Sequence, residues 1–144
     1  MRRVLGIDLG SRRIGVAVSD GMGLTAQPRS TLERKGGMRD MESVRKALAD
    51  ADADRIVLGL PLDPEGNEGD AARRARDFAE KLRVNLQVPV ELIDESFSTV
   101  EAEEVLLAAN VSRAKRKLVV DKLAAAVILQ RWLDANRAKK DPTP

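Results

Sequence analysis

The stretch of residues 4–10, Val-Leu-Gly-Ile-Asp-Leu-Gly, constrains the fold of this chain more than any other. It is short, apolar and bounded by glycine, which is typical of a buried strand rather than a helix. Side chains alternate along a strand, so Val4, Gly6 and Asp8 are predicted to share one face. Asp8 would then lie among core positions, where a charge must be neutralised, paired or bound to a cation. The alternative is a structural aspartate that accepts backbone N–H bonds at the following turn.

The rest of the chain predicts a mixed sheet flanked by helices. Residues 13–19 alternate and follow the first strand so closely that the two must form an antiparallel hairpin. A third, weaker strand is predicted within residues 24–32. The remaining predicted elements are a helix around 41–48, a strand at 55–60, a helix around 71–82, a strand at 90–93, and helices at 98–110 and 112–136. This order predicts an α/β fold in one domain, residues 1–138, with a frayed tail at 139–144.

Acidic residues fall at informative places on three of these elements. Asp8 lies in the first strand, and Asp121 lies in an apolar stripe of the last helix. Asp94 and Glu95 follow the last strand at its C-terminal end, where open α/β sheets bind their ligands. Converging carboxylates repel one another unless a cation lies between them, and an oxygen-only ligand set suits Mg²⁺ or Mn²⁺. The residues alone leave open whether Asp94 or Glu95 completes such a site.

The composition limits the chemistry that is available to the chain. There are no Cys and no His, which excludes thiolate and imidazole nucleophiles, zinc fingers and disulfides. Phosphodiester hydrolysis by a pair of metal ions needs no histidine, because the ions activate the attacking water. No apolar run reaches membrane-spanning length and no signal peptide precedes the first strand. The sequence therefore predicts a cytoplasmic protein that does not contact membranes.

Charge is segregated along the chain. Residues 1–36 carry 7 Lys and Arg against 3 Asp and Glu, residues 110–144 carry 9 against 3, and residues 37–109 carry 9 against 17. If the two basic ends meet in space, they form a positive face that suits a polyanion, whereas the middle is typical of solvated helices. The residues predicted to contact phosphate are Arg12, Arg13, Arg113, Lys115, Arg116 and Lys117. With two Phe, one Trp and no Tyr, the chain offers little for base stacking.

Four blocks of sequence resemble the YqgF/RuvX family. They are residues 6–17, residues 59–62, residues 94–102, and residues 115–117 with 121–125. The blocks follow the family's order and span nearly the whole chain. The resemblance implies an RNase H-like fold with a mixed five-stranded sheet, its first three strands antiparallel. It also implies a metal-dependent nuclease that acts in 5′-end processing of pre-16S ribosomal RNA or on Holliday junction DNA.

The resemblance also implies which acids carry the chemistry. The family's acids match Asp8, Glu95 and Asp121, which are expected to be both catalytic residues and ligands of two Mg²⁺ or Mn²⁺ ions. One position departs from the family's pattern, because Ser96 stands where the family usually has an arginine after the Asp-Glu pair. If that arginine contacts phosphate, either this chain binds its substrate differently or more weakly, or Arg12, Arg13 or Arg116 takes the place of the arginine.

Several alternatives stay open at this point. The substrate is expected to be a nucleic acid, either structured RNA or branched DNA, the cleavage either endo- or exonucleolytic, and the chain either a monomer or a homodimer. A non-catalytic nucleic-acid-binding module with the same fold and basic face is the main rival. Actin-like ATPases and sugar kinases share the core fold, but they need two such lobes, and this chain has no GxxxxGK motif.

Overall fold

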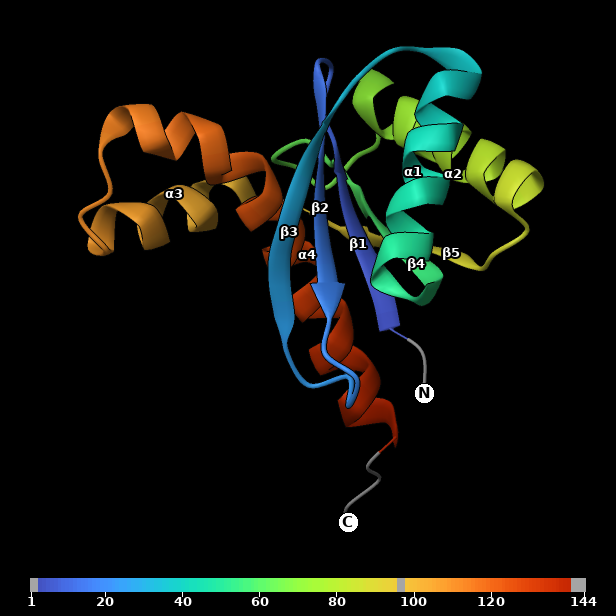
Figure 1. The fold of residues 1–144 in the computed structure, drawn as a ribbon. Helices are drawn as coiled ribbons and strands as arrows, with labels where there is room; N and C mark the ends of the chain where they lie inside the picture. Colours follow the sequence, from blue (N-terminus) through green and yellow to red (C-terminus); the bar gives the residue numbers. More distant parts are fainter. Residues whose placement is uncertain (1–2, 96–97, 141–144) are drawn as a thin grey trace.

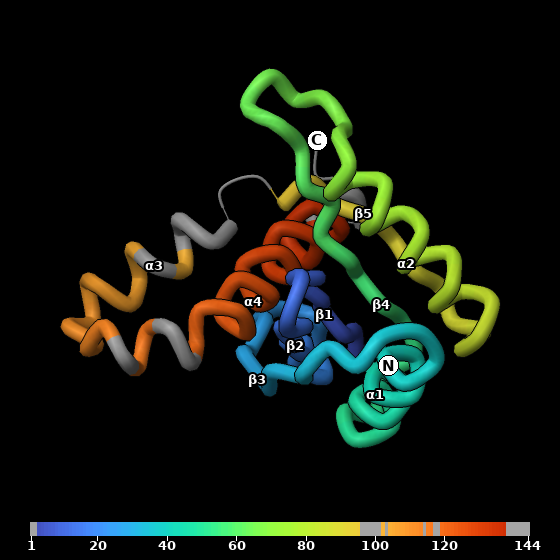
Figure 2. Tube along the Cα trace, turned by 90° about the horizontal axis from the view of Figure 1, so that it is seen from above, coloured from blue at the N-terminus to red at the C-terminus, as the bar shows by residue number. Residues whose placement is uncertain are grey.

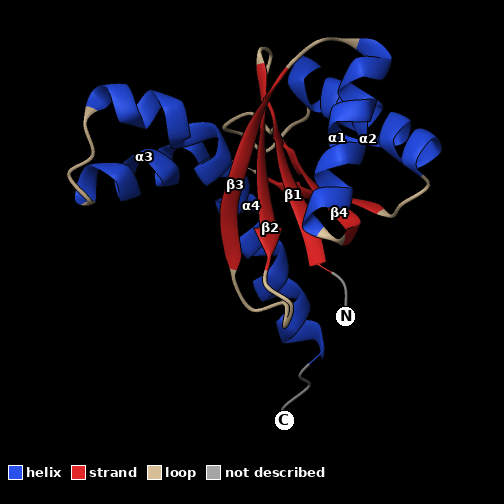
Figure 3. Cartoon of the chain, viewed as in Figure 1, coloured by secondary structure: helices blue, strands red, loops and turns tan. Residues whose placement is uncertain are grey.

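The protein forms a five-stranded mixed sheet with helices on both faces (Figures 1 and 3). The structure is a computed structural model that describes residues 3–95 and 98–140, except for the side chains of residues 98–101, 103, 114, 117, 118 and 138–140. Its elements are β1 (Arg3–Leu9), β2 (Arg13–Ser19), β3 (Ala26–Glu33), α1 (Gly37–Ala51), β4 (Ala53–Leu60), α2 (Asp70–Leu86), β5 (Val90–Asp94), α3 (Ser98–Ala108) and α4 (Arg113–Lys140).

The sheet has the strand order β3-β2-β1-β4-β5. β1 and β2 form the predicted antiparallel hairpin, with a tight turn in which the N–H of Gly10 donates to the carbonyl of Arg13 at 2.9 Å. β2 and β3 are also antiparallel, whereas β4 and β5 run parallel to β1 and to each other. This arrangement confirms the predicted mixed five-stranded sheet, in which the first three strands are antiparallel.

Two separate apolar clusters hold the helices to the two faces of the sheet. Alternate residues of β1 and β2, such as Leu5, Ile7 and Val16, are fully buried beneath α1 and α2. On the opposite face the buried residues of α4 pack on the small side chain of Ala17 and on Val57. Figure 2, viewed from above, shows α4 on one side of the strands and α1 and α2 on the other. The predicted division of β1 into two faces is confirmed, and Asp8 lies on the face covered by α4.

The last two helices form a hairpin that projects from the body of the protein. α3 lies away from the sheet and contacts the first turns of α4, whereas the later turns of α4 pack on the strands (Figure 1). The hydroxyl of Ser112 caps α4, since it accepts from the N–H of Lys115 at 3.4 Å.

Three helices extend beyond the ranges predicted for them. α1 spans Gly37–Ala51, α2 continues to Leu86, and α4 continues to Lys140, past its predicted end at about residue 136. The residues that extend α4, Arg-Ala-Lys-Lys, favour helix without producing an apolar stripe. The first two residues of the predicted tail, 139 and 140, thus belong to α4, and residues 141–144 lie outside the described residues. No helix in the described part of the chain is both long and apolar enough to cross a membrane.

Candidate active site

Asp8 lies between two glycines of the neighbouring strands. It pairs with Gly15 on β2, and on the other side the pairing of Ile7 with Leu58 places it beside Gly59 on β4. Glycines inside strands usually mark a site where another group approaches closely. A Cβ atom on Gly59 would collide with the carboxylate of Glu95, and one on Gly15 would collide with the backbone carbonyl of Asp121. The glycines therefore open space around Asp8 for the two other candidate acids.

Gly6, which precedes Asp8 on the same face, has a different role. A Cβ atom there would lie 2.7 Å from the Cβ of Leu129 and 3.1 Å from the carbonyl oxygen of Ala125. The space beside Gly6 is thus filled by α4. The small residues on both elements allow α4 to lie directly on β1 and β2, which brings Asp121 over the strands.

The structure distinguishes between the two acids that end the last strand. Asp94 is the final residue of β5 and is exposed, whereas Glu95 is half-buried and turns toward Gly59 and Asp8. The backbone N–H of Glu95 donates to the carbonyl of Leu60 at 3.2 Å, which ties it to the end of β4. Glu95 is therefore the acid that joins Asp8, in agreement with the resemblance.

Asp8 and Glu95 form a hydrogen-bonded pair of carboxyl groups. Burial raises the pKa of Glu95 to about 8, and the charge of Asp8 and the hydrogen bond with Asp8 add to that rise. Burial also raises the pKa of Asp8; the hydrogen bond from Glu95 opposes this rise, and the charge of Asp121 adds to it. At neutral pH the Glu95 O–H therefore donates to the Asp8 carboxylate, because two buried carboxylates this close cannot both ionise.

Asp121 is held by Arg13 from the neighbouring strand. The Nε of Arg13 donates to Oδ2 of Asp121 at 2.8 Å, with both side chains partly exposed at 44% and 28%. Asp121 is nevertheless near enough for its charge to raise the pKa of Asp8. Within the described residues, no group of three acids has the arrangement that would hold a metal ion as it stands. Oδ2 of Asp121 is engaged by Arg13 in this arrangement.

The donor set nevertheless fits a hard divalent cation. Oε2 of Glu95 is buried and has no hydrogen-bond partner, a costly state for a polar atom that a metal ligand bond would relieve. All the candidate ligands are carboxylate oxygens, which suit Mg²⁺ or Mn²⁺. Asp8 and Glu95 are therefore the residues that would hold such an ion, and Asp121 is the third acid near them.

The basic residues that were predicted to contact phosphate differ in their exposure and in their contacts within the protein. Arg12, Arg113 and Lys115 have exposed side chains, as a phosphate contact requires. Arg116 is half-buried, and its Nη1 donates to the carbonyl of Val111 at 2.9 Å, so it stabilises the turn between α3 and α4. Arg13 is occupied by Asp121, and the side chain of Lys117 lies outside the described residues, as does Ser96. The two basic ends do approach each other, since β2 and β3 pack on α4.

Arg131 is a member of this site that the sequence did not reveal. It lies on α4, its Nη1 donates to the carbonyl of Asp94 at 3.2 Å, and its charge partly opposes the rise in the pKa of Glu95. Asp121 and Arg131 lie ten residues apart on one helix, and this spacing matches no recognisable sequence motif. Gly15 and Gly59 were also overlooked, although an isolated glycine inside a strand is a recognisable signal of close approach.

The proton that Glu95 shares with Asp8 makes the stability of the metal-free protein depend on pH. The folded chain releases the Glu95 proton near pH 8, whereas the unfolded chain releases it near the ordinary value of 4.5. The folded state therefore binds more protons in this window, and its free energy of unfolding should fall as pH rises from about 4.5 to about 8. One pKa unit corresponds to about 1.4 kcal/mol, which gives an upper bound of about 5 kcal/mol.

Thermal unfolding in EDTA between pH 4 and pH 9 measures this dependence. Glu95→Gln, which is neutral at every pH, should flatten most of the slope, whereas the exposed Glu104→Gln should leave it unchanged. If Glu95→Gln retained the full slope, the buried proton would have to belong to another group.

The chain is similar to known proteins over most of its length. Residues 2–135 match the family described as RuvX, Holliday junction resolvase. A protein of Myxococcus xanthus named "Putative pre-16S rRNA nuclease" is 49% identical over 135 residues, covering 94% of this chain and 89% of that protein. A protein of the same name from Halothermothrix orenii is 45% identical over 132 residues, covering 92% and 94%.

Solved structures resemble the fold at much lower sequence identity. The RuvC protein of Thermus thermophilus in complex with a Holliday junction has a TM-score of 0.60 at 20% identity, over 96% of this chain and 97% of that one. A fowlpox virus resolvase with Holliday junction DNA has a TM-score of 0.58 at 10% identity, over 93% and 98%. These two likenesses support the RNase H-like fold alone. The family match and the identity to both relatives establish that the chain belongs to the RuvX family.

Proposed function

We propose that this protein is a divalent-metal-dependent nuclease that hydrolyses phosphodiester bonds. The observation that carries the proposal is the convergence of Asp8, Glu95 and Asp121 on one face of the sheet. The three acids come from β1, from the end of β5 and from α4. Burial raises the pKa of Asp8 and of Glu95, and the charge of Asp121 adds to the rise at Asp8, as the charge of Asp8 does at Glu95. An arrangement that destabilises the metal-free protein is expected at a functional site rather than at a purely structural one.

Two ions of Mg²⁺ or Mn²⁺ are expected to be held by these three acids. When bound, such ions lower the pKa of the attacking water and stabilise charge on the attacking and leaving oxygens. The protein's own contribution is to hold the carboxylates on rigid elements. The glycines of β2 and β4 keep the site open, and Arg131 anchors the segment that carries Glu95.

Nucleic acid is the substrate that the relatives and the charges support. Relatives that are 45–49% identical are named for pre-16S rRNA, and the family is named for Holliday junctions. Exposed Arg12, Arg113 and Lys115 can contact phosphates near the acids. We therefore propose 5′-end processing of pre-16S rRNA as the main activity, with cleavage of branched DNA as a further one. A cleavage assay that compares pre-16S RNA 5′ ends, single-stranded RNA and four-way DNA tests this choice directly.

Cleavage should depend on the metal ion. We expect no activity in excess EDTA, and restoration by Mn²⁺ at least as well as by Mg²⁺, since all the ligands are carboxylates. Ca²⁺ should support substrate binding without cleavage, because its larger and looser coordination misplaces the attacking water. The measurement is a gel assay of cleaved substrate beside an anisotropy measurement of binding under each condition. Full activity in EDTA would overturn the metal mechanism.

The ion pair between Arg13 and Asp121 favours a second candidate function. A salt bridge of 2.8 Å between them neutralises one of the acids in the absence of metal. A protein that binds nucleic acid without cleaving it would not need Asp121 as a metal ligand, so Asp121 could stay paired with Arg13. Under that alternative, substrate binds equally well with and without metal and is never cleaved, whereas the nuclease proposal requires cleavage in Mg²⁺ or Mn²⁺.

A further inference from the structure

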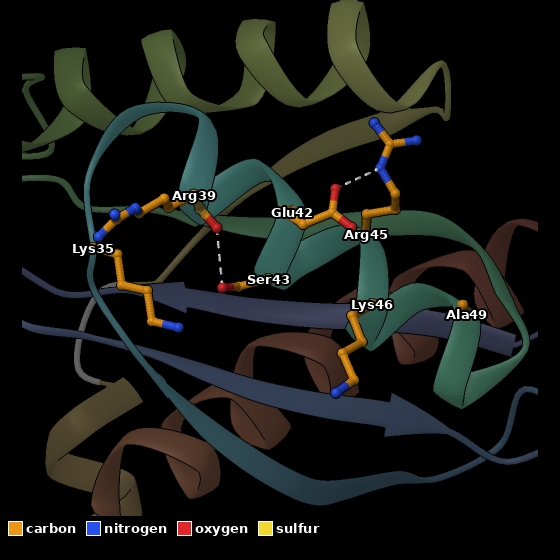
Figure 4. Close-up of a pocket in the computed structure, with 7 residues that line it drawn as sticks. All are labelled: Lys35, Arg39, Glu42, Ser43, Arg45, Lys46 and Ala49. Carbon is orange, nitrogen blue, oxygen red and sulfur yellow. Dashed lines mark hydrogen bonds and ion pairs between the residues drawn. The ribbon is translucent and has the colours of Figure 1, made fainter.

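A shallow groove of about 600 Å³ lies along the exposed side of α1, and we call it the α1 groove (Figure 4). Four of its lining residues are basic, and Glu42 is its one acidic lining residue. The basic residues are Lys35, Arg39, Arg45 and Lys46. Lys35 lies near the end of the basic stretch 1–36, whereas Arg39, Arg45 and Lys46 lie within the stretch 37–109 that carries an excess of acids, so counting charges along the sequence did not reveal these three.

Three of the four positive charges are not neutralised by the protein. Arg45 forms an ion pair with Glu42 at 3.2 Å and donates to the carbonyl of Asn85 at 3.3 Å. Figure 4 shows the Arg45 guanidinium turned toward Glu42. Lys35, Arg39 and Lys46 are exposed, and their side chains form no ion pair or hydrogen bond within the described residues. The α1 groove therefore presents a concentrated positive charge to solvent.

The spacing of these charges matches a nucleic-acid backbone. Arg39 and Lys46 are two helical turns apart on the outer stripe of α1, whereas Met41, Val44 and Leu48 on the inner stripe are buried. Seven residues of helix span about 10 Å. One strand of B-form DNA carries a phosphate about every 3.4 Å along its axis, so about three phosphates lie alongside this distance.

The α1 groove begins beside the turn that follows Asp8. Arg34, which precedes Lys35, donates from its backbone N–H to the carbonyl of Arg12 at 2.8 Å. Its Nη1 also donates to the carbonyl of Gly10 at 2.8 Å. These two bonds tie Arg34, the neighbour of the groove residue Lys35, to the β1–β2 turn. Exposed Arg12 in that turn continues the line of positive charge.

We propose that the α1 groove binds the phosphate backbone of the substrate at a distance from the scissile bond. The proposal rests on the proposed function, since it assumes that the chain acts on nucleic acid. α1 and the hairpin of α3 with the start of α4 lie on opposite sides of the sheet (Figures 1 and 2). A substrate that reaches both must be wide, as folded RNA and branched DNA are. The α1 groove therefore selects structured nucleic acid over short single strands.

The double variant Arg39→Ala, Lys46→Ala tests the proposal. Both residues are exposed on a helix, and alanine favours helix, so the fold should be retained. Binding of a labelled folded RNA and of a four-way DNA junction is measured by anisotropy in EDTA across a range of salt concentrations. We expect the slope of log K against log salt to become shallower by about 2, because two phosphate contacts are lost. At about 0.15 M salt, affinity should fall by roughly tenfold.

A charge-matched control separates the groove from a general effect of net charge. Arg73→Ala, Arg137→Ala removes the same charge from exposed positions on α2 and near the end of α4, and should preserve the wild-type slope. A single strand of four nucleotides is too short to contact the α1 groove and the acids at once, so the groove variant should weaken its binding by less than that of the folded RNA.

Each outcome bears on the proposal. A shallower slope for RNA alone, or for DNA alone, supports the groove and identifies which nucleic acid it binds. A wild-type slope in the groove variant, or an equal change in the control variant, overturns it. The cleavage assay tests the proposed function separately. If the wild type cleaves but the groove variant keeps the wild-type salt slope, only the groove proposal is refuted. If the groove variant has a shallower salt slope but the wild type does not cleave, only the nuclease proposal is refuted.

Discussion

Replacement of Asp8 by asparagine should abolish cleavage while leaving the protein folded and able to bind its substrate. Asparagine has nearly the shape of aspartate, so β1 and its packing should persist. The change removes one strong ligand for a hard cation. We expect activity to fall by at least about 1,000-fold, the scale seen when one member of a catalytic group is lost. Substrate affinity should survive, because the phosphate contacts lie elsewhere.

The stability of the same variant distinguishes a metal site from a structural role. Asp8→Asn removes a carboxylate whose charge is disfavoured by burial and by the nearby charge of Asp121, so the metal-free variant should unfold at a higher temperature than the wild type at neutral pH. If Asp8 instead serves only as a hydrogen-bond acceptor at the turn, the variant should lose roughly 1–3 kcal/mol and keep its activity. Asp54→Asn, at an exposed position of β4, is the matched control and should change neither property.

The three acids should also behave as one unit. Glu95→Gln and Asp121→Asn are each expected to lose cleavage to a similar degree as Asp8→Asn. Double variants should be little worse than single ones, since members of one catalytic group are not additive. If the losses in cleavage rate of the single variants multiplied in the double variants, the acids would act at separate sites.

Introducing a single methyl group at Gly15 should have the largest effect on stability. A Cβ atom there would collide with the backbone carbonyl of Asp121, and backbone atoms of a long helix cannot move aside without displacing α4. Overpacking of this kind costs about 1–3 kcal/mol and sometimes more. We expect Gly15→Ala to lower the melting temperature and to abolish cleavage, because Asp121 would be lifted away from Asp8.

Two further glycines provide the controls for this experiment. Gly21→Ala, in the turn after β2, meets nothing within 4 Å and should match the wild type in both measurements. A Cβ atom at Gly59 would collide with Oε2 of Glu95 and lie 2.9 Å from the Cβ of Glu95 and 2.8 Å from Cδ1 of Ile128, all of them side-chain atoms that can shift more than a backbone carbonyl. Gly59→Ala should therefore fold better than Gly15→Ala yet still lose activity. A Gly15→Ala protein with the wild-type melting temperature would show that α4 does not lie on β2 as described.

The sequence predicted the elements and their order because those depend on local signals. The alternation of residues 13–19, the glycine-bounded run at 4–10 and the short turn between them require an antiparallel hairpin. Helical spacing located α1, α2 and α4, although all three continue beyond their predicted ranges. The candidate acids were found for the same reason, because a carboxylate within an apolar stretch is a local anomaly.

What only the tertiary structure decided concerns distances between elements that are far apart in the chain. The choice of Glu95 over Asp94 depends on which side chain meets Gly59 across the sheet. The pairing of Arg13 with Asp121 joins residues that are 108 positions apart. The α1 groove was hidden because charge counted along the chain averages opposite faces of a helix, whereas a ligand meets one face at a time. Sequence thus determined which residues could act, and packing determined which of them meet.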